Sequence, residues 1–174
     1  MPRRCSPKPE ETGPEVPGAV PLPFRRTPPS VGAVSDTAPT LFFRVGGMPF
    51  FERLVDAFYA GVATDDVLLP LYPEQPDLTG ARHRLTLFLV QYWGGPTTYS
   101  DERGHPRLRM RHFPFHLGPV QRDRWLHHMG AAVAAVCDDP AVAEELMAYF
   151  VTAAEHLRND TGLPITSASY GNGR

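Results

Sequence analysis

The chain of 174 residues carries 17 basic and 19 acidic side chains, which gives a formal net charge of −2 at pH 7. This length suits one well-packed domain with an appendage, and the near-neutral charge excludes the broad basic surface that sequence-independent binding of nucleic acid needs. Cys5 and Cys137 lie at opposite ends of the chain, so no stabilising disulfide is expected. No apolar run approaches the roughly 18 residues that cross a bilayer. We therefore expect a soluble, cytoplasmic protein without a membrane partner.

The first segment, residues 1–39, is rich in proline. Ten of the twenty prolines fall within the first 40 residues, and no helical or strand periodicity survives there. The sequence therefore predicts a disordered N-terminal arm. The arm could dock a partner, or it could be an unselected tail or the product of a start codon upstream of the true one, and we assign it no chemistry.

Two amphipathic helices are predicted next. The first covers about residues 49–63, because its apolar residues recur at helical spacing and Pro49 stands in the first turn. The second covers about residues 78–92 and ends where Gly94, Gly95 and Pro96 stop a helix. The apolar stripes are Phe51, Leu54, Val55, Phe58, Tyr59 and Val62 in the first helix, and Leu78, Ala81, Leu85, Phe88, Leu89 and Tyr92 in the second.

Two further helices follow a long connection. One begins after Gly118 and Pro119 and runs to about Val136, and the other begins at Asp139 and Pro140 and runs to about Leu157. No β-hairpin signal appears between the four helices, so the fold class is all-α. We expect one domain over residues 40–160, followed by a flexible tail over residues 161–174.

The connection from Gly95 to Gly118 is longer than a compact helical domain normally needs between neighbouring helices. It holds His105, Arg107, Arg109, Arg111, His112 and Phe113. Histidine beside apolar helices, with arginines nearby, suits a haem, because iron takes a neutral imidazole and the propionates take cations. Residue types alone do not decide this, since most histidines are ordinary polar residues. A zinc site at His112 and His116 is disfavoured because Pro114 interrupts the helix and no cysteine or acidic ligand supports it.

A longer sequence pattern indicates one family of haem proteins. The chain contains, in this order, the runs QYWGGP, YS, RGHPRLRMRH and RDRWL. This pattern closely resembles the group II truncated haemoglobins, the two-over-two helical globins common in actinobacteria. The resemblance runs from about Leu41 to Asn159 and includes the paired glycines Gly46 and Gly47. It implies an all-α truncated globin, a two-over-two helical sandwich that encloses haem b (iron protoporphyrin IX) between the second and third long helices. In this family a loop largely replaces the proximal helix, which would explain the long connection.

The resemblance also implies roles for single residues. The proximal iron ligand falls on His112 in RMRH. Three distal hydrogen-bond donors fall on Tyr59 in AFYAGV, Tyr72 in LYPE and Trp125 in RDRWL. The place where many globins carry a distal histidine falls on Ala81, so entry there is expected to be open.

Further cofactor-binding residues follow from the same resemblance. Leu85 lies one helical turn after Ala81. Arg84 and Arg111 stand where cations pair with the propionates, and Tyr99 is a weaker candidate for that role. Against these roles stands the plain alternative that the aromatic residues are core and the arginines are solvated surface residues.

The function implied is reversible binding of dioxygen, and of NO, CO or peroxide; oxygen transport is one possible use, although a pocket rich in donors suits a carrier poorly because it would hold O2 tightly. Two alternatives stay open: a redox enzyme with dioxygenase- or peroxidase-like activity, and a haem-based gas sensor. No catalytic residue is assigned. The sequence shows no G-x-G-x-x-G fingerprint, so sustained turnover would need an external reductase. A homo-oligomer is left open.

The composition of the arm generates a first prediction. A proline-rich polar segment without periodicity buries too little apolar surface to offset the entropy cost of ordering. A shortened protein that starts at Ala38 should therefore keep the helicity and haem affinity of the full chain, measured by far-UV circular dichroism and haem titration. Loss of either property would show that the arm packs on the domain.

Overall fold

A computed structural model describes residues 38–160 of the chain. The arm predicted for residues 1–39, apart from its last two residues, and the tail predicted for residues 161–174 lie outside the described residues, so these boundaries stay predictions. Every element between residues 38 and 160 is helical. The elements are α1 (Leu41–Arg44), α2 (Met48–Val62), the short 3-10 helix η1 (Leu69–Leu71), α3 (Thr79–Tyr92), α4 (Thr98–Arg103), α5 (Leu108–His112), α6 (Pro119–Val136) and α7 (Pro140–Leu157). The predicted all-α class is confirmed.

The four helices predicted from periodicity are α2, α3, α6 and α7, each within a residue or two of its expected ends. Their boundaries have local causes. Gly46, Gly47 and Gly94 adopt φ of 89°, 78° and 95°, a region that other residues rarely enter, so the chain can turn sharply around α2 and α3. The Asp139 carboxylate accepts hydrogen bonds from the Ala141 and Val142 backbone and caps α7.

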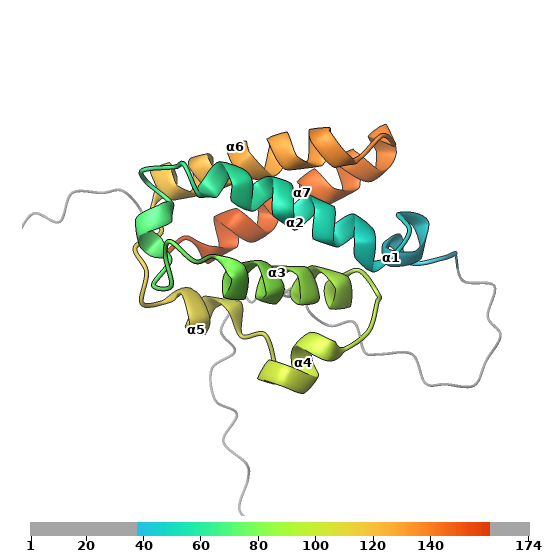
Figure 1. Ribbon diagram of the computed structural model, residues 1–174, viewed down its shortest axis with the longest axis horizontal. Helices are drawn as coiled ribbons and strands as arrows, with labels where there is room; N and C mark the ends of the chain where they lie inside the picture. Colours follow the sequence, from blue (N-terminus) through green and yellow to red (C-terminus); the bar gives the residue numbers. More distant parts are fainter. Residues whose placement is uncertain (1–37, 161–174) are drawn as a thin grey trace, which may run out of the picture. The chain divides into compact units, whose positions relative to one another are not determined.

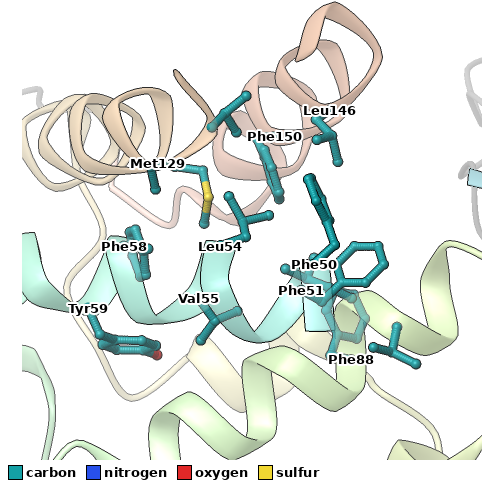
Figure 2. Packing of buried hydrophobic residues seen from close by; sticks show 14 of the residues in the cluster. Phe50, Phe51, Leu54, Val55, Phe58, Tyr59, Phe88, Met129, Leu146 and Phe150 are labelled. Carbon is teal, nitrogen blue, oxygen red and sulfur yellow. The ribbon is translucent and has the colours of Figure 1, made fainter. Parts of the chain in front are cut away.

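The long helices form two antiparallel pairs (Figure 1). One pair is α2 with α3 and the other is α6 with α7, and α2 also packs along α6. Figure 2 shows how α2 serves both pairs: Leu54 reaches toward Met129 of α6 and Phe150 of α7, whereas Val55 and Tyr59 lie on the side that faces α3. The core therefore continues from one pair to the other through α2.

Close approach of α2 and α6 requires a glycine. A Cβ atom added at Gly61 would overlap the ring of His128, well inside van der Waals contact. With hydrogen at this position, the two helices can approach until their side chains interdigitate. This contact lies near the end of α2, close to the turn that leads to η1.

The connection between residues 95 and 118 contains more helix than the expected loop. Two short helices, α4 of six residues and α5 of five, occupy it. Neither spans two turns, so neither produces a periodic apolar stripe that a sequence pattern can detect. None of the helices within residues 38–160 has the length and apolar character needed to cross a membrane.

A buried carboxylate fixes the turn that follows α2. The Asp65 side chain is 2% exposed. One carboxylate oxygen accepts hydrogen bonds from the backbone N–H groups of Val67 and Leu68, both at 2.9 Å. The other accepts from His128 Nε2 at 2.6 Å and lies 3.0 Å from Arg124 Nε. Burial raises the pKa of this carboxyl, but the hydrogen bonds from His128, Leu68 and Val67 outweigh it and lower the pKa to about 2.

Loss of this charge should lower stability in a pH-dependent way. The folded pKa of about 2 lies below the ordinary 3.8, so the contribution is fully present above about pH 4–5 and is lost as the pH falls through about 2. Asp65→Asn should reduce the free energy of unfolding at pH 7 by about 2 kcal/mol. Urea unfolding followed by far-UV circular dichroism should show roughly half of that difference at pH 3.

Asp66→Asn is the matched control. The Asp66 side chain is 86% exposed and pairs with the same arginine, Arg124, at 2.7 Å. Because water screens such a pair, its removal should leave the free energy of unfolding nearly unchanged. Equal losses for the two variants would contradict the role assigned to the buried carboxylate.

Candidate functional site

A cavity of about 700 Å³ opens among α2, α3, α5, α6 and α7. Its volume falls within the range of cofactor pockets, about 300–1,000 Å³. All of the residues for which the family resemblance implied a place at the site line it, namely Tyr59, Tyr72, Ala81, Arg84, Leu85, Tyr99, Arg111, His112 and Trp125. The structure thus brings together positions that are spread over 67 residues of sequence. The walls also include residues of α7, so the cavity is not bounded by the second and third long helices alone.

His112 ends α5 and is partly buried. Its Nδ1 lies 2.8 Å from the backbone oxygen of Leu108. A carbonyl oxygen can only accept, so Nδ1 carries a proton, and in the neutral ring Nε2 keeps a free lone pair. A neutral imidazole, oriented by a backbone carbonyl and with a bare Nε2, is the form that binds a metal ion.

Two tyrosines lie together in the cavity wall. Tyr59 comes from α2 and Tyr72 follows η1, and their rings meet edge to face with centroids 5.6 Å apart. Burial raises the pKa of Tyr59, and the neighbouring Tyr72 adds to that effect. Burial also raises the pKa of Tyr72, against a smaller lowering by the hydrogen bond with Tyr59. Both phenols therefore stay protonated at neutral pH and can donate.

Trp125 is held in α6 by aromatic neighbours. Its ring lies 5.1 Å from that of Phe58 and 5.7 Å from that of Phe150, measured between centroids. The indole N–H has no hydrogen-bond partner within residues 38–160. Because an indole N–H can only donate, it is available to an acceptor in the cavity.

Two arginines expected near the propionates have different surroundings. Arg84 makes a two-pronged ion pair with Glu74, at 2.9 and 3.0 Å, at the edge of the cavity. Arg111 donates to the backbone oxygens of Pro106 at 2.8 Å and Arg103 at 2.7 Å, so it braces the chain that leads into α5. Their roles toward propionates stay predictions.

Several cavity residues were missed by the sequence reasoning. Glu74 stands two residues after Tyr72, and its ion pair with Arg84 holds it at the edge of the cavity. The spacing of residues in the sequence does not predict this pair. Tyr149 of α7 also lines the cavity, and burial raises its pKa. The Nε atom of Arg158 is buried there without a hydrogen-bond partner. Arg158 lies just past the end of α7, where only tertiary packing brings it to the cavity.

The other histidines near the site have partners of their own. His116 pairs with Asp160 at 2.9 Å, and His128 with Asp65. No group of three or more His, Cys, Asp or Glu side chains gathers into a metal site within the described part of the chain.

The donor set fits a haem. A large apolar cavity receives a flat ring, His112 offers a free imidazole nitrogen, and cationic side chains lie at the rim. The buried Nε of Arg158 lacks an acceptor, which a carboxylate of a bound group could supply. His112 would hold the iron, and Arg84 and Arg111 are the nearest candidates for the propionates.

Comparisons with known proteins agree with this geometry. The family model described as bacterial-like globin matches residues 40–159. The chain is 38% identical to the group 2 truncated hemoglobin YjbI of Bacillus subtilis over 115 residues, which cover 66% of this chain and 86% of that protein.

Solved structures give the same result. A thermostable haemoglobin from the actinobacterium Thermobifida fusca is 54% identical, with a TM-score of 0.68 over 70% of this chain and 98% of that one. A truncated haemoglobin from Bacillus subtilis, described as oxygen-avid, is 36% identical, with a TM-score of 0.65 over 70% of this chain and 100% of that one. The chain belongs to the bacterial-like globins and, within them, to the group II truncated haemoglobins, whose cofactor is haem b.

Proposed function

We propose that the protein binds dioxygen reversibly at a haem iron held by His112, and that NO, CO and peroxide enter the same pocket. The observation that carries the proposal is the orientation of His112, whose Nδ1 donates to the Leu108 carbonyl and whose Nε2 is free at the cavity. Haem iron supplies the electron density that a diatomic ligand accepts. The chain's own residues supply the ligand to the iron and the polar groups around the gas.

The tyrosine pair is suited to donate to such a ligand. Tyr59 and Tyr72 lie side by side, with ring centroids 5.6 Å apart, and burial keeps both phenols protonated. Either O–H can therefore donate to a ligand. Packing of the two rings limits their motion, so less entropy is lost when a ligand arrives. Trp125 adds a third donor, with its indole held by Phe58 and Phe150.

The ion pair with Glu74 uses two of the five N–H donors of Arg84, so a propionate would bind the remaining donors or displace Glu74. The hydrogen bond from Arg84 lowers the pKa of Glu74, so this pair is charged at neutral pH. A propionate at the rim would compete with the Glu74 carboxylate for the same guanidinium. Arg111 keeps one nitrogen, Nη1, without a partner among residues 38–160, which suits an additional acceptor.

Redox turnover is the second candidate. Three donors in one pocket would hold dioxygen tightly, and the similar Bacillus subtilis structure is described as oxygen-avid. Slow release suits oxygen transport poorly and suits turnover of O2, NO or peroxide better. In that case a reductase would have to return the iron to its ferrous state after each cycle.

The assignment of His112 can be tested by spectroscopy. His112→Ala removes the imidazole and should abolish the native Soret band and the ferrous-CO spectrum. His116→Ala is the control, because that exposed histidine stands four residues later and pairs with Asp160. If His112→Ala left both spectra unchanged, another residue would hold the iron.

The donor assignment predicts faster release of dioxygen when a donor is removed. A hydrogen bond of about 1.5–3 kcal/mol corresponds to roughly a ten- to hundredfold change in rate. Tyr59→Phe, Tyr72→Phe and Trp125→Phe should each show this in stopped-flow measurements of O2 dissociation. A double variant of the two tyrosines should be non-additive, because the hydroxyls form one network.

Tyr149→Phe is the matched control for the donors. It deletes a hydroxyl in the same cavity that is outside the tyrosine pair. Its rate should stay within about twofold of the parent, since no bond to the ligand is lost. Parental rates in all three donor variants would leave Tyr59, Tyr72 and Trp125 as core aromatics and would favour a plain carrier.

A further inference from the structure

The segment around His112 is strongly basic. From Arg103 to Arg122, both included, the chain carries five of its 17 basic side chains and none of its 19 acidic ones. The chain as a whole has a slight negative charge, so this concentration of positive charge is local. We refer to Arg103, Arg107, Arg109, Met110 and Phe113 as the α5 patch.

The three arginines of the α5 patch are exposed. None of these three arginines forms an ion pair within residues 38–160. Six other arginines in the same part of the chain do pair with carboxylates: Arg44, Arg82, Arg84, Arg122, Arg124 and Arg158. Within the described residues, the α5 patch therefore keeps more unpaired positive charge than the rest of the domain, and only Arg103 acts at longer range on a carboxylate, that of Glu74.

Two large apolar side chains of the same segment are also exposed. Phe113 is 80% exposed and Met110 is 67% exposed. A mixture of apolar side chains and arginine is typical of the centre of protein interfaces, in which aromatic residues, methionine and arginine are enriched. The α5 patch therefore has the composition of a docking surface as well as the charge.

The backbone of the patch is held in place. Arg107 adopts φ of 41° and ψ of 48°, a left-handed conformation that costs free energy for a residue with a side chain. The Arg111 guanidinium stabilises this turn by binding the backbone oxygens of Arg103 and Pro106. The exposed arginines consequently project from a fixed segment, which lowers the entropy cost of docking.

The patch reaches the rim of the cavity. Arg103 and Met110 line the same cavity as His112. A protein seated on the patch would therefore lie directly beside the cofactor pocket, without an intervening helix.

We propose that the α5 patch docks an acidic electron-donor protein, a flavin or iron–sulfur protein with carboxylates around its redox centre, which reduces the haem. The inference rests on the proposed function, because only ferrous iron binds dioxygen. The donor gives up one electron and is oxidised by one, and ferric iron becomes ferrous; no covalent bond forms or breaks. A small surface suffices, since redox encounters bury less than about 1,200 Å² and rely on charge for their rate.

An acidic protein fits the patch better than an anionic membrane does. Interfacial helices carry a long apolar face that enters the lipid. α5 has five residues, and only Met110 and Phe113 are exposed apolar residues there. The membrane alternative is kept as an outcome of the test.

The test uses the ferric, haem-loaded full chain and a photoreduced acidic flavodoxin, mixed anaerobically under CO in a stopped-flow instrument. The second-order rate of haem reduction should fall at least tenfold between about 10 and 300 mM ionic strength. Arg109→Glu should lower the low-salt rate about five- to tenfold, and this difference should vanish at high salt. Phe113→Ser should slow reduction without changing the salt dependence.

Arg53→Glu provides the matched control. Arg53 is exposed on α2, is unpaired within the described residues and lies outside the α5 patch. It should change the rate less than twofold. A rate that does not depend on salt, or an equal effect of Arg53→Glu, would overturn the proposal.

Two further measurements separate the possible failures. The Soret spectrum and the O2 dissociation rate of Arg109→Glu should match the parent, because neither involves the donor. If those properties hold while reduction is unaffected by the substitution, the docking inference fails and the proposed function stands. Binding to phosphatidylglycerol vesicles that Arg109→Glu abolishes, with an unchanged reduction rate, would assign the patch to a membrane instead.

Discussion

The burial of α2 on two sides constrains every other part of the domain. Consecutive residues point to different layers: Phe58 contacts Trp125 of α6, with ring centroids 5.1 Å apart, and Tyr59 contacts Tyr72 on the side of α3. This arrangement needs a close approach to α6, which the glycine at position 61 permits. Since one helix anchors both pairs, a shift of α2 would move the tyrosine pair and the tryptophan relative to each other.

The Asp65 carboxylate fixes the turn after α2 relative to α6, and in this way it positions residues of the site although it does not line the cavity. It binds the backbone after α2 and, 63 residues away in sequence, His128 of α6. The turn it fixes leads through η1 to Tyr72, and Arg124, its second partner, precedes Trp125. A buried ion pair adds little net stability, but it specifies one arrangement, because any displaced alternative would leave a charge buried and unpaired.

Local sequence rules predicted the long helices because their causes are local: the apolar stripe of α2, the glycines after α3 and the Asp139 cap are each visible within a few residues. They could not predict α4 and α5, which are too short to show a period, or the contacts of Asp65 with His128 and of Glu74 with Arg84. Ion pairs between distant residues follow from packing, and many other pairings of the same charges are equally compatible with the sequence. The candidate site residues came from resemblance to a family, which carries the tertiary information that spacing lacks.

The partner of His112 bears on what the site can do. A carboxylate hydrogen-bonded to Nδ1 would make the imidazole a stronger electron donor to iron, and that would favour cleavage of a bound O–O bond. The Leu108 carbonyl is a weaker acceptor. The basic segment around His112 contains no acidic side chain that could take its place, and the same lack of acid leaves the α5 patch charged. Both properties therefore have one cause: the segment is braced by Arg111 and backbone carbonyls rather than by carboxylates, so a carbonyl faces Nδ1 of His112 and the surface stays positive.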